Sequence, residues 1–140
     1  MLGISQAFMD ALLVGGLAAK LAGGPGVAYI FLYDGTKPPT PGGAPDGSCH
    51  LLATIALAAV PTHWNSTAHK LELVQGDLTG DLVAVQGSAT WGRLFTADDT
   101  WMADGTAVNV ADAGDFKVSG TTGTLLYLGA RAQLGLTTFG

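Results

Sequence analysis

The single cysteine of the chain, Cys49, is followed directly by His50, which places a thiol beside an imidazole in the sequence. A nucleophilic cysteine needs a base within hydrogen-bonding distance of its sulfur. Neighbouring residues of a strand point to opposite faces of a sheet, so this order works against such a pair. We therefore expect Cys49 to act as a small hydrophobic residue. No catalytic residue is assigned, and we expect no enzymatic activity.

Histidine and aspartate are the other candidates for site chemistry. His63 and His69 flank a short polar segment, but a zinc site needs three or four convergent ligands, and the only glutamate is Glu72. Aspartates recur close together and offer oxygen ligands of the kind that calcium takes; they are Asp77 with Asp81, Asp98 and Asp99 with Asp104, and Asp112 with Asp115. None has the spacing of a calcium-binding loop, and Asp and Gly also favour β-turns. We predict turns here, with no metal ion and no cofactor.

Tryptophans raise the alternative of a sugar-binding surface. Trp64 and Trp101, with the Asp98-Asp99 turn, would suit a carbohydrate-binding or hydrolytic module. Trp91 lies in a strand-like run in which alternation places Trp91, Arg93 and Phe95 on one face and Leu94 on the other. We expect that tryptophan to pack under the aliphatic stem of Arg93.

The charge of the chain is low for its size. Its 140 residues suit one domain (1–140), with 48% hydrophobic residues and 21 glycines. Charged residues make up 12%, against about 25% in typical soluble domains. Six basic and eleven acidic residues give a net charge of −5, and the basic residues form no stripe, which argues against direct binding of nucleic acid. An exterior with so few charges favours association with a partner or with itself.

The sequence pattern of the N-terminal region predicts neither a signal peptide nor a membrane-spanning helix. Asp10 interrupts its first apolar run, and no basic segment precedes that run. Lys20 and the Gly23-Gly24-Pro25-Gly26 break divide the apolar segment that follows into pieces too short for a bilayer. With one cysteine, no disulfide can form within the chain, which fits assembly in a reducing cytoplasm.

Residues 1–24 are predicted to form a helical N-terminal segment. Ser5 is a suitable N-cap, apolar residues recur at three- and four-residue spacing up to Leu21, and the Gly23-Gly24-Pro25 sequence ends the helix. The helix has few polar residues, so we expect it to be buried against the domain or against another chain. Gly15 and Gly16 weaken it, and a kink or a close contact is expected there.

Residues 27–140 are predicted to form a β-sandwich core. Strands are expected at 27–33, 50–57, 70–74, 82–86 and 88–96, with short pieces at 102, 108–110 and 116–118 and a last pair or long strand within 125–136. The Pro-rich stretch 36–48 is expected to be a long loop. Short strands between Gly, Asp and Thr turns indicate an antiparallel jelly-roll-like sandwich behind a short N-terminal helix, and the long crossing loop favours Greek-key connections.

Several short motifs in this order resemble capsid cement (decoration) proteins of tailed bacteriophages. The motifs are Phe8-Met9-Asp10-Ala11, Ile30-Phe31-Leu32-Tyr33-Asp34-Gly35-Thr36-Lys37-Pro38, Leu51-Leu52-Ala53-Thr54 and Gly87-Ser88-Ala89-Thr90-Trp91-Gly92-Arg93-Leu94. The resemblance implies a jelly-roll-like domain without catalytic residues. It implies binding to the outer surface of an HK97-fold lattice of the major capsid protein, often as a dimer or trimer, and hence a place on the virion exterior after synthesis in the host cytoplasm.

On this basis the helix and the Pro-rich loop are the expected contact pieces. Large apolar side chains dominate the energetics of interfaces, and the expected partner-interface residues are Phe8, Leu12, Leu13, Leu17, Pro38, Pro39 and Pro41. We expect removal of the residues before Val27 to abolish shell binding and leave a folded β core. A neck, tail or fibre-attachment protein of the same virion is an alternative, as is the carbohydrate-binding module.

Overall fold

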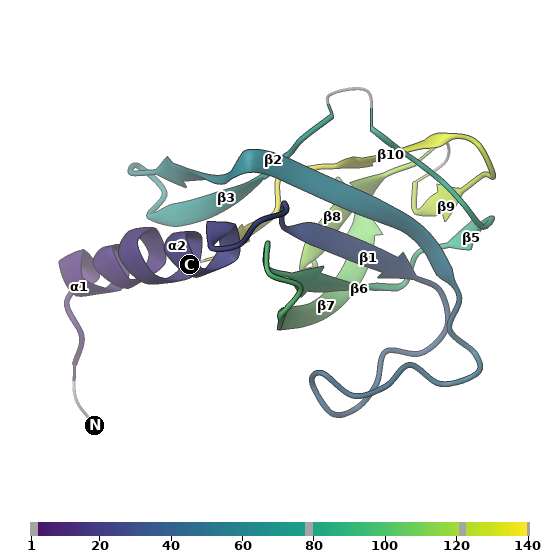
Figure 1. Ribbon diagram of the computed structural model, residues 1–140, viewed down its shortest axis with the longest axis horizontal. Helices are drawn as coiled ribbons and strands as arrows, with labels where there is room; N and C mark the ends of the chain where they lie inside the picture. Colours follow the sequence, from purple (N-terminus) through teal and green to yellow (C-terminus); the bar gives the residue numbers. More distant parts are fainter. Residues whose placement is uncertain (1–2, 78–79, 121–122, 140) are drawn as a thin grey trace.

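The computed structural model describes residues 3–77, 80–120 and 123–139 and begins with a single helical segment (Figure 1). It consists of α1 (Gln6–Ala11), the π-helical turn η1 (Leu12–Leu17) and α2 (Ala18–Ala22). The Ser5 hydroxyl accepts a hydrogen bond from the Phe8 N–H at 3.2 Å, which confirms the predicted N-cap. The wider π-helical turn contains Gly15 and Gly16, and a Cβ added at either glycine would meet nothing within 4 Å, so these glycines make no close contact within the chain.

The rest of the described chain is a strongly curled sheet. The strands are β1 (Tyr29–Tyr33), β2 (Leu51–Asn65), β3 (Lys70–Gln75), β4 (Asp81–Leu82), β5 (Gly87–Ser88), β6 (Trp91–Phe95), β7 (Trp101–Asn109), β8 (Phe116–Ser119), β9 (Leu125–Leu126), β10 (Arg131–Leu134) and β11 (Thr138–Phe139). Within the described residues nine strands are ordered β11-β3-β2-β1-β6-β7-β8-β10-β4, and β5 pairs separately with β9. The predicted mainly β, jelly-roll-like sandwich with a short N-terminal helix is confirmed. The β7–β8 pair is parallel, whereas the other pairs are antiparallel.

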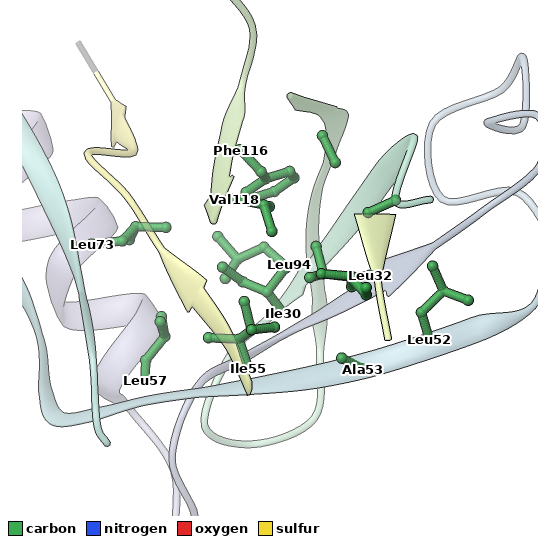
Figure 2. Close-up of a cluster of buried hydrophobic side chains, with 14 of the residues drawn as sticks. Ile30, Leu32, Leu52, Ala53, Ile55, Leu57, Leu73, Leu94, Phe116 and Val118 are labelled. Atoms are coloured by element: carbon green, nitrogen blue, oxygen red, sulfur yellow. The ribbon is translucent and has the colours of Figure 1, made fainter. Parts of the chain in front are cut away.

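The core lies inside the curl of this sheet (Figure 2). Period-two alternation directs Ile30 and Leu32 of β1 inward, toward Leu94 of β6 and toward Phe116 and Val118 of β8. β2 adds its own inward row to the same cluster, namely Leu52, Ala53, Ile55 and Leu57. These side chains are buried almost completely. The apolar alternation of the central strands therefore determines which face of the sheet becomes the core.

Several predicted strand boundaries are wrong. β2 continues to Asn65 instead of ending at residue 57, because an irregularity in its pairing between Leu57 and Thr62 accommodates Pro61. The predicted strand 82–86 is reduced to Asp81–Leu82, and 88–96 is shortened to Trp91–Phe95. The expected fragments around 102 and 108 are one nine-residue strand, β7. The segment 125–136 forms two short strands on either side of Gly129, but β9 pairs with β5 and β10 with β4 and β8.

Candidate interaction surface

The N-terminal helix is attached to the β body near its C-terminal end. Leu21 has no exposed surface, and its carbonyl oxygen accepts a hydrogen bond from the Ala97 N–H at 3.0 Å. Gly24 lies against the same turn, since a Cβ there would approach the Ala97 backbone to 2.4 Å. Leu21 is thus part of the core. A truncation that keeps the core whole must begin near Ala18, which corrects the expected boundary before Val27.

A second attachment lies near the start of the helix. The Asp10 carboxylate approaches Nδ1 of His69, in the β2–β3 turn, to 2.8 Å. The Gln6 side-chain amide donates a hydrogen bond to the same carboxylate at 2.7 Å. This hydrogen bond and the nearby His69 imidazole lower the pKa of Asp10. The helix therefore lies along the β2–β3 hairpin and presents one fixed face outward.

The outward face of the helix is apolar. Phe8 is 56% exposed and Leu12 49% exposed, as expected of contact residues. Three further exposed apolar residues of this segment were not among the expected contacts, and they are Ile4, Met9 and Val14. Leu13 and Leu17 are half-buried on the inner side. We define the helix surface as Ile4, Phe8, Met9, Leu12 and Val14. The helix is therefore only partly buried against its own domain, through Leu21 and the half-buried Leu13 and Leu17, and burial of its outer face against another chain stays a prediction.

A second exposed apolar group lies at the opposite end of the molecule. The Val83 N–H donates to the Ala130 carbonyl oxygen and the Gly129 N–H to that of Val83, which holds the two segments around them side by side. The exposed members of this group are Leu82, Val85, Tyr127 and Leu128, and we call them the far-end surface. Figure 1 shows β5 and β9 on the right and the helix on the left. The alternating pattern predicts a strand at 82–86, so the sequence alone does not predict that Leu82 and Val85 belong to an exposed apolar surface.

The Pro-rich loop (residues 36–48) is fixed to the sheet by a buried ion pair. Arg93 Nε and Nη2 donate to the two Asp104 carboxylate oxygens at 2.7 and 2.9 Å, and Nη2 also donates to the Gly43 carbonyl oxygen. The Gly42 N–H and Trp101 Nε1 donate to the same carboxylate at 2.9 and 3.0 Å. Burial alone would raise the pKa of Asp104, but these hydrogen bonds and the guanidinium charge outweigh it and lower the pKa.

Of the loop prolines proposed as contacts, Pro38 is buried and Pro39 and Pro41 are exposed. Pro38 therefore belongs to the packing of the loop itself. Because the loop is held by the buried pair of Arg93 and Asp104, Pro39 and Pro41 are presented on a fixed backbone.

The aromatic side chains form a cross-strand array on the outer face of β1 and β6. Tyr29 stacks on Phe95, with centroids 5.0 Å apart, and Tyr33 on Trp91 at 4.4 Å. Trp91 is fully buried, with the Arg93 guanidinium carbon 5.3 Å from its ring centroid, which confirms the predicted packing. In each stacked pair, the neighbouring ring covers one face of its partner. This array contains neither of the tryptophans named for the carbohydrate-binding alternative, Trp64 and Trp101.

The residues of that alternative are also separated. Trp64 lies in β2 and Trp101 in β7, with β1 and β6 between them in the sheet. The Asp98 carboxylate accepts a hydrogen bond from the nearby Thr96 hydroxyl. The Asp99 carboxylate accepts one from the Tyr29 hydroxyl of β1. The hydrogen bond from Thr96 contributes most to the lowered pKa of Asp98.

Cys49 and His50 have different partners. The Cys49 thiol donates to the Thr36 carbonyl oxygen at 3.3 Å, and His50 Nδ1 lies 3.1 Å from both Asp34 carboxylate oxygens. Cys49 is half-buried. Among the described residues there is no cluster of three or more His, Cys, Asp or Glu side chains that could hold a metal ion.

Comparisons with protein-family models, with curated proteins and with solved structures found no match for this chain. Within the described ranges, no helix has the length and apolar character needed to cross a membrane.

Proposed function

We propose that this chain is a structural, non-enzymatic protein of a tailed-bacteriophage virion: a cement protein on the outer surface of an HK97-fold capsid. One observation carries the proposal. Of the fifteen large apolar side chains that are exposed among the described residues, nine lie in two groups, the helix surface and the far-end surface, and these groups belong to opposite ends of the molecule. A protein that joins neighbouring subunits of the major capsid protein needs two such contacts on one rigid body.

Lattice binding of this kind stabilises a shell by mass action. A ligand that binds the assembled lattice and not the free subunits shifts the equilibrium toward the assembled shell, which then resists internal DNA pressure. A second contact made by an already bound molecule is effectively intramolecular, so two weak apolar contacts suffice. The helix surface has no charged side chain, so its burial carries little desolvation penalty.

The same properties support self-association as a dimer or trimer on the lattice. The proposal places the chain on the virion exterior after synthesis in the host cytoplasm, without direct contact to nucleic acid or membrane. A neck, tail or fibre-attachment role would use the same surfaces on a less numerous partner.

Copy number tests the proposal and separates these roles. Purified virions of the phage that encodes the chain are analysed by quantitative mass spectrometry against the major capsid protein. A cement protein is expected at a copy number comparable with that of the capsid subunit. A few copies per particle would favour a neck or tail role instead of a cement role, and absence from virions would overturn the proposal.

Two substitutions test the surfaces. Leu12→Asp on the helix surface and Leu128→Asp on the far-end surface are each expected to weaken binding to heads assembled without the chain by at least about tenfold, equivalent to about 1.4 kcal/mol. Val110→Asp is the matched control, because Val110 is 50% exposed and lies on the turn after β7, outside both surfaces. Equal binding of all three variants in cosedimentation would contradict the assigned surfaces.

A further inference from the structure

Part of one edge of β7 is not paired with another strand in the described residues. This strand pairs with β6 from Trp101 to Thr106, but β8 pairs only with Ala107, Val108 and Asn109. Among the described residues, the second edge of β7 therefore has no strand partner before Thr106. Unpaired strand edges present backbone donors and acceptors that can pair with another extended chain.

The direction of the backbone groups follows from two hydrogen bonds. The Ala107 N–H donates to Thr90 on the β6 side, whereas the Thr106 N–H donates at 2.8 Å to the Asp115 carboxylate on the open side. Successive residues of a strand alternate between its two edges, so the N–H and C=O of Asp104 also face the open side. Neither group has a hydrogen-bond partner within the described ranges. Asp115 thus stands where an adjacent strand would begin.

Beside this edge lies a pocket of about 540 Å³. One wall is the β7 segment 103–105 together with the turn 113–115 and the start of β8, and the other is formed by Lys70 and residues 136–139. Phe116 and Phe139 give the pocket an apolar floor. A strand paired with β7 would lie about 4.8 Å from it, inside this space.

The charges in the pocket favour an acidic occupant. Both of its carboxylates are engaged, Asp104 by Arg93 and Asp115 by the Thr106 N–H and hydroxyl. Lys70 and Lys117 also line the pocket, and neither forms an ion pair with any described residue. Lys70 lies on the wall opposite Asp104, whereas Lys117 lies on the same wall as Asp104. With Arg93 and Asp104 neutralising each other, these two lysines and the Asp115 carboxylate leave the pocket with one net positive charge for a ligand.

We propose that this pocket binds an extended acidic segment of a partner protein, which adds a strand to the free edge of β7. Backbone hydrogen bonds to Asp104 supply affinity for any extended chain, and alternate side chains of that segment determine specificity. An apolar side chain enters between Phe116 and Phe139, and an Asp or Glu side chain faces Lys70 and Lys117. This site is separate from the helix and far-end surfaces and does not depend on the virion assignment.

A synthetic peptide tests the proposal. The probe is an acetylated and amidated hexapeptide of sequence Thr-Val-Glu-Val-Thr-Val, titrated into the full chain by NMR with amide exchange measured at Asp104. Saturable binding with protection of the Asp104 amide is expected. Lys70→Gln with Lys117→Gln should weaken it by about tenfold, because the charge-assisted contacts are lost. Lys37→Gln, in the Pro-rich loop, should bind as the unaltered chain does.

Two further arms separate strand addition from other binding. The same peptide with its alternate backbone amides N-methylated keeps its side chains but loses strand hydrogen bonds, and it should not bind. Ala113→Asp, in the exposed turn that lines the pocket, should weaken binding by charge repulsion, whereas the nearby Ala111→Asp should not. Absence of binding at millimolar peptide, or equal binding of the N-methylated peptide, would overturn the proposal.

Discussion

Replacement of Asp104 by alanine removes the acceptor that joins the Pro-rich loop to the sheet. The side chains of Arg93 and Asp104 are 9% and 3% exposed, so the substitution leaves a guanidinium buried beside Trp91. Breaking a buried ion pair on one side costs about 3–5 kcal/mol. Arg93 keeps its hydrogen bond to Gly43, which places the expected loss near the lower end, at about 3 kcal/mol. For a chain of this length that is a fall in melting temperature of about 10 °C.

Urea denaturation followed by circular dichroism measures the loss. The matched control is Asp112→Ala, because Asp112 is exposed in a turn and changes there stay within about 0.5 kcal/mol. Limited proteolysis gives a second reading, since cleavage within residues 36–48 should accelerate in Asp104→Ala and remain slow in the control. The double variant Arg93→Met with Asp104→Leu removes both charges and should be more stable than Asp104→Ala.

Two results would refute this reasoning. A loss below about 1 kcal/mol in Asp104→Ala would mean that water already solvates the pair, as at exposed salt bridges. A double variant less stable than Asp104→Ala would mean that the remaining contacts of Arg93, its hydrogen bond to Gly43 and its packing on Trp91, outweigh the cost of leaving its guanidinium unpaired.

Three further predictions concern the body of the fold. Leu21→Ala should destabilise the chain by about 2–5 kcal/mol in urea denaturation, whereas Leu12→Ala, on the exposed helix face, should change stability by less than about 0.5 kcal/mol. Gly35 has a φ of 76°, and a Cβ there would lie 2.4 Å from the Ser48 carbonyl oxygen. Gly35→Ala should therefore lower the free energy of unfolding by more than about 1 kcal/mol. Gly47→Ala is the control and should lower it much less, because a Cβ at Gly47 would meet nothing within 4 Å. The pKa of Asp104 is lowered in the folded chain. The ionised carboxylate therefore contributes its full stabilisation above pH 3.8, the usual aspartate pKa, and this stabilisation is lost as the pH falls below that value. Asp104→Asn should flatten this part of a plot of the free energy of unfolding against pH.

The central strands could be predicted because their signal is local. β1 and β3 lie where alternation and β-branched or aromatic residues placed them, and Leu71 and Leu73 of β3 point inward as the pattern required. The short strands could not be predicted, because Val83 and Val85 alternate as residues of a strand do, while the Val83 backbone pairs with the turn around Gly129 and the Val85 N–H donates to the Leu52 carbonyl oxygen. Such pairing depends on contacts distant in sequence.

β7 shows how a local signal can mislead. Asp104 and Gly105 together are typical of a turn, and the predicted strand was divided there. In the fold the Asp104 side chain is the buried partner of Arg93, eleven residues away, and Gly105 leaves room for Asp115. Both residue types are required by tertiary contacts that periodicity does not reveal. The free edge beside them was missed for the same reason.

For the helix, the sequence identified an apolar surface but not its orientation. Residues at three- and four-residue spacing line both the face with Leu13 and Leu17 and the face with Phe8 and Leu12. Tertiary contacts choose between them, because burial of Leu21 and the pairing of Asp10 with His69 turn the first face inward. Periodicity alone cannot supply such contacts.

The solvent-accessible area of the chain is larger than the area expected for a compact monomer of the same mass. A compact monomer of 14.2 kDa exposes about 6,800 Å², whereas this chain exposes 7359 Å². The excess of about 560 Å² is smaller than the share of about 800 Å² that one partner contributes to a standard interface. A chain with 12% charged residues has few means of keeping such an area in water, and its large exposed side chains on the helix are apolar. The apolar helix surface therefore supports the proposal that the helix forms one half of an interface.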